Sequence, residues 1–287
     1  MGKLRVIGQS VLYLLVFLGI MMGATLGGSV LILVYGILFL HVPPEQVEQY
    51  LNSMLYNGNI TMILTLFMYL ILLVGFGLWY WFYCRKKENV VSGMTAMTPG
   101  NVLLVTVIGI LLQILTQPVM VGVEHFLPEV FKEYLELIES VKMGETNLFL
   151  IVICIVLIGP LTEELFFRGI LYRTLRKEMS FIAAAVISSL VFGIYHMNLV
   201  QGIYCSLVGF VLCYVYEKTK SFLVTSVLHI VFNGSSYVLD YFLQSLTEQQ
   251  TNMLEAFDLI ILAVCLGIFF FAIFKLKSYR EVSNENV

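Results

Sequence analysis

The sequence predicts an all-α membrane protein, a polytopic bundle of about eight transmembrane helices, from three observations. Of the 287 residues, 59% are hydrophobic and only 12% are charged. Several uncharged runs exceed the roughly 20 residues that a helix needs to cross a bilayer. Alternating strand-like segments of about 10 residues are absent, which argues against a transmembrane β-barrel. The chain is therefore expected to lie largely within a membrane.

The apolar runs follow one another at short intervals, and no linker, repeat or low-complexity tract divides them. We therefore expect a single integral membrane domain over 1–287, with a functional core at about 147–240. Two amphipathic stretches, 43–57 and 124–145, are expected to form helices on the membrane surface, and the second could equally be a lid over the bundle. The expected spans are 6–40, 60–83, 101–123, 147–173, 181–196, 200–216, 222–240 and 257–274.

The basic residues predict the orientation of the bundle. If both termini are cytoplasmic, 13 of the 16 Lys and Arg residues lie on the cytoplasmic side, as the positive-inside rule requires. Lys132 and Lys142 then lie outside, and Arg168 lies within the membrane. No basic block suggests a nucleic-acid partner. The cytoplasmic set is Lys3, Arg5, Arg85, Lys86, Lys87, Arg173, Arg176, Lys177, Lys218, Lys220, Lys275, Lys277 and Arg280.

Three charged residues lie inside the fourth expected span: Glu163, Glu164 and Arg168. Ionisable groups are expensive within a bilayer, so those that occur there are usually paired and functional. Glu164 and Arg168 are four residues apart, so on a helix they share a face and can neutralise one another. Glu163 points about 100° away and stays available for other work. Taken alone, the stretch is also compatible with a structural ion pair between helices.

Two further spans carry polar groups. His196 follows Phe192 by one helical turn in the fifth span, and His229 and Asn233 share one face of the seventh. A single histidine in an apolar helix is more often a core residue than a functional one. Two histidines, an asparagine and two glutamates in three neighbouring spans instead indicate a site.

The chemistry that suits this set is hydrolysis of an amide. A glutamate can take a proton from water, and histidines or a metal ion can stabilise the oxyanion, with Asn233 as a further donor. Two histidines and a glutamate are also a known ligand set of hydrolytic zinc. His196 and His229, with Glu163, are therefore candidate metal ligands, although the sequence lacks an HExxH arrangement.

The motifs resemble those of a known family of intramembrane endopeptidases. This is the CAAX-protease and bacteriocin-processing family, also called CPBP or Abi, which includes type II CAAX prenyl endopeptidases. The resemblance covers about 163–233 on an eight-span layout typical of the family. Its three motifs occur in order as Glu163-Glu164-x-x-x-Arg168, Phe192-x-x-x-His196 and His229-x-x-x-Asn233.

The resemblance implies a role for each of these polar residues in a protease of a bacterial plasma membrane. Glu163 would activate the attacking water, and Glu164 with Arg168 would shape and support the site. The family is usually described as metalloproteases, which implies a divalent metal such as zinc, but a glutamate mechanism without an obligatory metal has also been argued. Both options stay open. The catalytic centre would be completed by His196, His229 and Asn233.

The expected partners are membrane lipid and a hydrophobic or lipidated peptide or protein substrate. Prenylated CAAX proteins, a bacteriocin, a pheromone or another membrane peptide all fit the resemblance. Two other classes of function remain alternatives. Buried Glu, His and Arg residues also form proton relays in transporters, although no two-fold repeat of broken helices is present. The same fold would also suit a non-catalytic scaffold or immunity protein.

The expected depths of the polar residues in the membrane differ. Counted at 1.5 Å per residue from the cytoplasmic helix ends, Glu163 lies ~15 Å deep, His229 ~10 Å and His196 ~22 Å. For the three to meet, a span must tilt, a helix must break at 159–160, or the fifth helix must begin outside the membrane.

Overall fold

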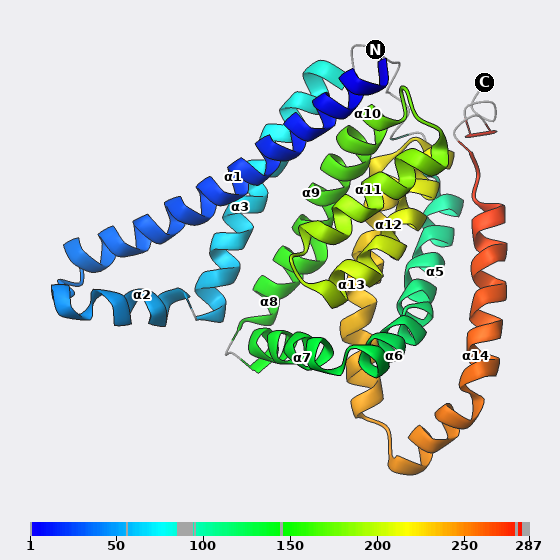
Figure 1. Cartoon of the computed structure of the whole chain (residues 1–287). Helices are drawn as coiled ribbons and strands as arrows, with labels where there is room; N and C mark the ends of the chain where they lie inside the picture. The colour runs from blue at the N-terminus through cyan, green and yellow to red at the C-terminus, as the bar shows by residue number, and fades with distance from the viewer. Residues whose placement is uncertain are drawn as a thin grey trace.

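The computed structural model shows a helical bundle in which the prediction of an all-α polytopic protein is confirmed (Figure 1). The part of the chain that it describes contains helices and no strand. The residues described are 2–55, 57–84, 94, 96–143, 146–278 and 281–282.

Within the described residues, seven helical segments are long and apolar enough to cross a membrane, so the chain is an integral multi-pass membrane protein. The fifth expected span is a shorter apolar helix, α11 (Phe181–Tyr195), of 15 residues. The seven long segments are Gly2–Leu38, Gly58–Phe82, Pro99–Phe126, Leu148–Leu175, Leu199–Thr219, Phe222–Gln244 and Ala256–Lys275.

The remaining elements follow the expected order along the chain. They are α1 (Gly2–Leu38), η1 (Pro44–Gln46), α2 (Val47–Leu55), α3 (Gly58–Trp79), η2 (Tyr80–Cys84), α5 (Pro99–Leu115), α6 (Gln117–Phe126), α7 (Pro128–Met143), α8 (Leu148–Ile151), η3 (Val152–Ile158), α9 (Gly159–Phe166), η4 (Phe167–Tyr172), α10 (Arg173–Leu175), α12 (Leu199–Thr219), α13 (Phe222–Gln244) and α14 (Glu248–Lys275).

The fourth span changes its helical geometry twice. The α-helical α9 lies between two π-helical stretches, η3 and η4. Pro160 occupies the first turn of α9, where its missing N–H and fixed φ are tolerated. The break expected at 159–160 is therefore a change from π-helical to α-helical turns. Such π-helical insertions are frequent at functional sites, and here they flank both glutamates.

Side-chain caps and short turns make α11, α12 and α13 antiparallel neighbours. Ser180, Asn198 and Ser221 precede these helices, and each side chain accepts a backbone N–H of the first turn. Met197 and Lys220 take left-handed backbone conformations, with φ of 54° and 53°, which reverse the chain within a few residues. The motif-bearing helices are thus packed against one another.

Two groups of buried side chains hold the bundle together. The first joins α1, α3, the fourth span and α11: Phe17 stacks on Phe166 with ring centroids 4.2 Å apart, and also contacts Phe76 and Tyr195. The second joins α5, α12, α13 and α14. Figure 1 shows the pair α1 and α3 on one side of α9, and α14 on the far side of the bundle. Members of the second group include Val105, Ile108, Leu212, Val215, Val224 and Leu228.

The two expected surface stretches form α2 and α7, at the end of the bundle opposite the start of α1 and the end of α14 (Figure 1). On α7, Val130, Phe131, Tyr134 and Ile138 are half-buried, as the amphipathic pattern predicted, whereas Leu127 before it is exposed. The side chain of Val141 lies outside the described residues.

The start of α1, the end of α14 and α10 all lie at one end of the bundle (Figure 1). The position of both termini in the cytoplasm stays a prediction from the basic residues. The run 85–87 and Arg280, which contribute to it, lie outside the described residues.

A cysteine-labelling experiment tests the orientation. Lys132 on α7 and Lys177 after α10 are both exposed and lie at opposite ends of the bundle. A cysteine that replaces Lys132 should react with a membrane-impermeant maleimide added to intact cells. A cysteine that replaces Lys177 should react only after lysis, because the positive-inside rule places it in the cytoplasm.

The parent for this labelling carries Cys84→Ser, and its unlabelled state is the control. The opposite labelling pattern would show that the bundle is inverted. The remaining native cysteines are buried: Cys154, Cys205, Cys213 and Cys265.

Candidate active site

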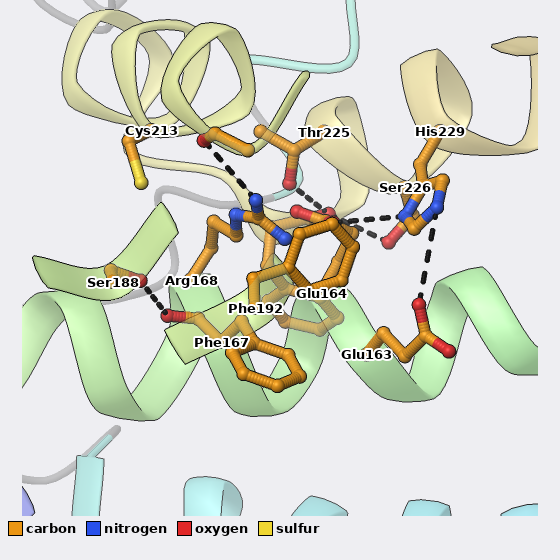
Figure 2. Close-up of polar contacts among 12 residues, drawn as sticks. Glu163, Glu164, Phe167, Arg168, Ser188, Phe192, Cys213, Thr225, Ser226 and His229 are labelled. Atoms are coloured by element: carbon orange, nitrogen blue, oxygen red, sulfur yellow. Dashed lines mark hydrogen bonds and ion pairs between the residues drawn. The ribbon is translucent and has the colours of Figure 1, made fainter. Parts of the chain in front are cut away.

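The two adjacent glutamates and the arginine of the fourth span are buried inside the bundle. Glu163 is 6% exposed, and Glu164 and Arg168 are completely buried. Arg168 Nη1 donates to Glu164 Oε1 at 2.6 Å, so the predicted pairing four residues apart is confirmed. The guanidinium also lies 4.5 Å from the centroid of the Phe192 ring, a cation–π contact (Figure 2).

Arg168 is tied to α12 as well as to its own helix. Its Nη2 donates to the backbone carbonyl of Gly209 at 3.2 Å. A Cβ atom at position 209 would lie 3.2 Å from Nη2 of Arg168, from the Phe192 ring and from the backbone of Ser189. Glycine therefore allows α12 to approach the guanidinium closely, and no larger residue would fit without displacing these neighbours.

His229 reaches from α13 toward both glutamates (Figure 2). Its Nδ1 lies 3.0 Å from Glu164 Oε1, and its Nε2 lies 3.9 Å from Glu163 Oε2. Because a carboxylate only accepts hydrogen bonds, Nδ1 carries a hydrogen, and a neutral ring then has its lone pair on Nε2. The distance from Nε2 to Glu163 is too long for a direct hydrogen bond. The histidine and the glutamate thus face each other across a narrow gap.

The other oxygen of Glu163 is held from α3. Tyr69 Oη donates to Glu163 Oε1 at 2.8 Å, and the hydroxyl of Tyr195 lies 3.5 Å from that of Tyr69. Neither tyrosine was expected from the sequence. Tyr69 is a polar residue in the middle of an uncharged span, and Tyr195 directly precedes His196, but tyrosines are common enough in membrane spans that neither position gives a signal by itself.

His196 is the residue at which α11 ends, and it is half-buried. Its Nδ1 lies 2.8 Å from the carbonyl oxygen of Phe192, so Nδ1 carries a hydrogen. Its Nε2 lies 3.6 Å from Cys205 Sγ on α12. His196 also interacts electrostatically with Glu163, although it makes no hydrogen bond to it.

The structure brings the two histidines close together despite the difference in depth expected between them. The Phe192 ring centroid lies 4.9 Å from that of His196 and 5.7 Å from that of His229, so one ring separates the two imidazoles. At 1.5 Å per residue, the 15 residues of α11 rise about 22 Å, less than the bilayer thickness. This rise equals the depth counted from the sequence, so the two histidines meet because of how α11 is placed in the bundle and not because of its length.

Asn233 lies one turn beyond His229 on α13, and both side chains face the fourth span. The sequence predicted that they address a single point, but their hydrogen bonds diverge. Asn233 Nδ2 donates to the carbonyl of Ile155 in η3 at 3.0 Å, whereas His229 bonds Glu164 in α9. Asn233 thus ties α13 to the π-helical stretch, and its amide retains a second N–H.

The side chains do not form a ready three-ligand metal site. Hydrolytic zinc takes three protein ligands at about 2.0–2.3 Å. Within the described residues, no group of three or more His, Cys, Asp or Glu side chains is placed to hold a metal ion. Glu163 and His229 face each other, but Nε2 of His196 is directed at Cys205.

The burial of the Glu164–Arg168 pair predicts a large effect of breaking it. Glu164→Gln leaves Arg168 buried without its counter-charge, which is expected to destabilise the fold by about 3–5 kcal/mol. The measurement is thermal unfolding of the purified protein in a mild detergent.

Lys220→Ala is the matched control for this substitution. It breaks the pair between Lys220 and Glu217, whose side chains are 47% and 24% exposed, and is expected to cost only about 0–1 kcal/mol. Equal melting temperatures for the two variants would contradict a structural role of the buried pair.

Comparison with known proteins places the cluster within a described family. Residues 145–235 match the family model for type II CAAX prenyl endopeptidase Rce1-like proteins. The curated protein "Putative membrane peptidase YdiL" of Bacillus subtilis is 29% identical over 107 residues, which cover 37% of this chain and 44% of that protein. The match thus spans less than half the length of this relative. No solved structure matches the chain.

The matched segment contains the fourth span, α11, α12 and the first half of α13. All the residues predicted from the sequence for the site lie within it, and the structure packs its helices around the buried Glu164 and Arg168. The segment 145–235 therefore belongs to the CAAX-protease family.

Proposed function

We propose that the protein is an intramembrane endopeptidase of a bacterial plasma membrane, with Glu163 as its general base. It hydrolyses a peptide bond in a membrane-associated, hydrophobic or lipidated peptide. The family of the segment 145–235 and the peptidase name of the Bacillus relative support this class of reaction. A prenylated CAAX protein is one such substrate, and this part of the proposal comes from the description of the matching family alone.

The observation that carries the proposal is the gap between Glu163 and His229. Two hydrogen-bond acceptors, Glu163 Oε2 and the lone pair of His229 Nε2, face each other at 3.9 Å. A water that makes hydrogen bonds of about 2.8 Å to both acceptors spans this distance at an angle of about 90° at its oxygen, so both hydrogen bonds are slightly bent. Such a water donates one hydrogen to each acceptor, and its own lone pairs stay available for attack.

The first step is attack by this water on the peptide carbonyl. Glu163 takes one proton while the water oxygen forms a bond to the carbonyl carbon, which gives a tetrahedral intermediate with a negative oxygen. The proton on Glu163 then passes to the peptide nitrogen, and the carbon–nitrogen bond breaks. Water is thereby divided between the two products, with OH on the new carboxyl group and H on the new amine.

The oxyanion requires hydrogen-bond donors in a site shielded from water. Asn233 supplies the N–H that is not bonded to Ile155. His196 donates through Nε2 only when its ring carries a second proton, because its Nδ1 hydrogen already bonds Phe192. Glu164 and Arg168 act behind these groups: Glu164 fixes the hydrogen of His229 on Nδ1 and so directs the Nε2 lone pair at Glu163.

The substitution Glu163→Gln tests the assigned base. Glutamine keeps the shape and can still accept from Tyr69, but it cannot take a proton from water. We expect cleavage to fall by at least the 10²- to 10⁴-fold that general-base catalysis contributes. The measurement is mass spectrometry of new peptide termini in membranes of cells that carry either the wild type or the variant.

The matched control is Glu178→Gln, which changes an exposed glutamate in the turn between α10 and α11. It should leave the set of termini unchanged. If Glu163→Gln, shown to be folded and inserted, yields the same termini as the wild type, the protease proposal is wrong and the non-catalytic scaffold is favoured. A transporter would instead lose substrate or proton flux in vesicles while its termini stay the same.

A further inference from the structure

We propose that Tyr69 is a positioning residue for Glu163: it fixes which carboxylate oxygen acts as the base. This inference rests on the proposed endopeptidase function. Tyr69 belongs to α3, far outside the segment 145–235 that matches the family, so the motifs of that segment do not include it. The assignment comes from the geometry around the carboxylate.

The two oxygens of Glu163 have different partners. Oε1 accepts the hydroxyl hydrogen of Tyr69 at 2.8 Å, and Oε2 faces His229 at 3.9 Å. Rotation about the Cγ–Cδ bond of Glu163 would exchange these two oxygens. If the carboxylate rotated freely, neither oxygen would be directed at the water for part of the time. The hydrogen bond from Tyr69 locks the orientation in which Oε2 is the base.

The position of Tyr69 is itself fixed by contacts with the fourth span. A Cβ atom at position 159 would lie 3.2 Å from the Tyr69 ring, so Gly159 allows the ring to lie directly against the start of α9. The hydroxyl of Thr162 lies 3.5 Å from the backbone carbonyl of Tyr69, in addition to its shorter bond to Ile158. Backbone and ring of Tyr69 therefore both contact the helix that carries Glu163.

A second tyrosine orients the first. Because the hydroxyl hydrogen of Tyr69 goes to Glu163, the contact with Tyr195 at 3.5 Å is one in which Tyr195 donates and Tyr69 accepts. Tyr195 comes from α11 and is adjacent to His196. The chain Tyr195–Tyr69–Glu163 thus links three helices, α11, α3 and α9, at the carboxylate.

The test compares the steady-state kinetics of Tyr69→Phe with those of the wild type, on a peptide substrate identified from the Glu163→Gln comparison. Phenylalanine keeps the ring and its packing and removes only the hydroxyl. Loss of orientation should lower kcat about 10- to 100-fold and leave KM within about two-fold, because a positioning residue acts on the base and not on substrate binding.

Tyr172→Phe is the matched control. Tyr172 is also buried and also donates to a glutamate, Glu217, at 2.7 Å, but this pair lies at the end of the fourth span, away from His229. It should leave kcat unchanged. If Tyr69→Phe keeps the wild-type kcat, or if Tyr172→Phe lowers kcat by the same factor, the positioning role is overturned.

The double variant Tyr69→Phe/Tyr195→Phe separates positioning from general structural damage. Since Tyr195 acts only through Tyr69, its substitution should lower kcat in the wild type but add nothing in the Tyr69→Phe background. Fully additive losses would overturn the proposed chain. Cleavage that persists in Glu163→Gln would instead refute the underlying endopeptidase function, so the two failures are distinguishable.

Discussion

The constraint on which the rest of the structure depends is the neutralisation of Glu164 and Arg168 inside the bundle. Neither side chain reaches solvent, and unpaired charges in such surroundings are prohibitively unfavourable. Their pairing requires the helical spacing of the fourth span. The pair is also held by two neighbouring helices: α12, for which Gly209 leaves space, offers a carbonyl to Arg168, and His229 on α13 donates to Glu164 Oε1. The helices that carry the site are therefore positioned by the same charges that the site contains.

Much of this could be predicted from the sequence, because the signals are local. Apolar runs of more than about 20 residues predict spans, and the four-residue spacing of Glu164 and Arg168 predicts their pairing. The expected span 181–196 matches α11, which covers Phe181–Tyr195. The depth calculated for His196 assumed an upright helix, and a count along one helix cannot show that His196 and His229 both contact Phe192.

The parts that could not be predicted depend on contacts between distant helices. Tyr69 lies 94 residues before Glu163 and is no more polar than other tyrosines of the chain, so only its placement beside α9 distinguishes it. Asn233 shares a helical face with His229, and the spacing correctly indicated this. The spacing did not indicate that η3, with its π-helical turns, presents the Ile155 carbonyl to the amide. The spacing of residues along the sequence predicts which of them share a face of a helix. The groups that contact this face depend on how the helices pack against one another.

The charge balance of the cluster bears on the chemistry that it favours. With both glutamates ionised and Arg168 cationic, the three groups carry one excess negative charge in a buried place. General-base catalysis creates no further charge there. In the proposed mechanism, the proton that Glu163 takes from water moves the negative charge to the oxyanion of the substrate, and the three groups are left neutral. The second N–H of Asn233 is the proposed donor to this charge, which moves only a short distance. A site of low polarity can support this step because the total charge is the same before and after it.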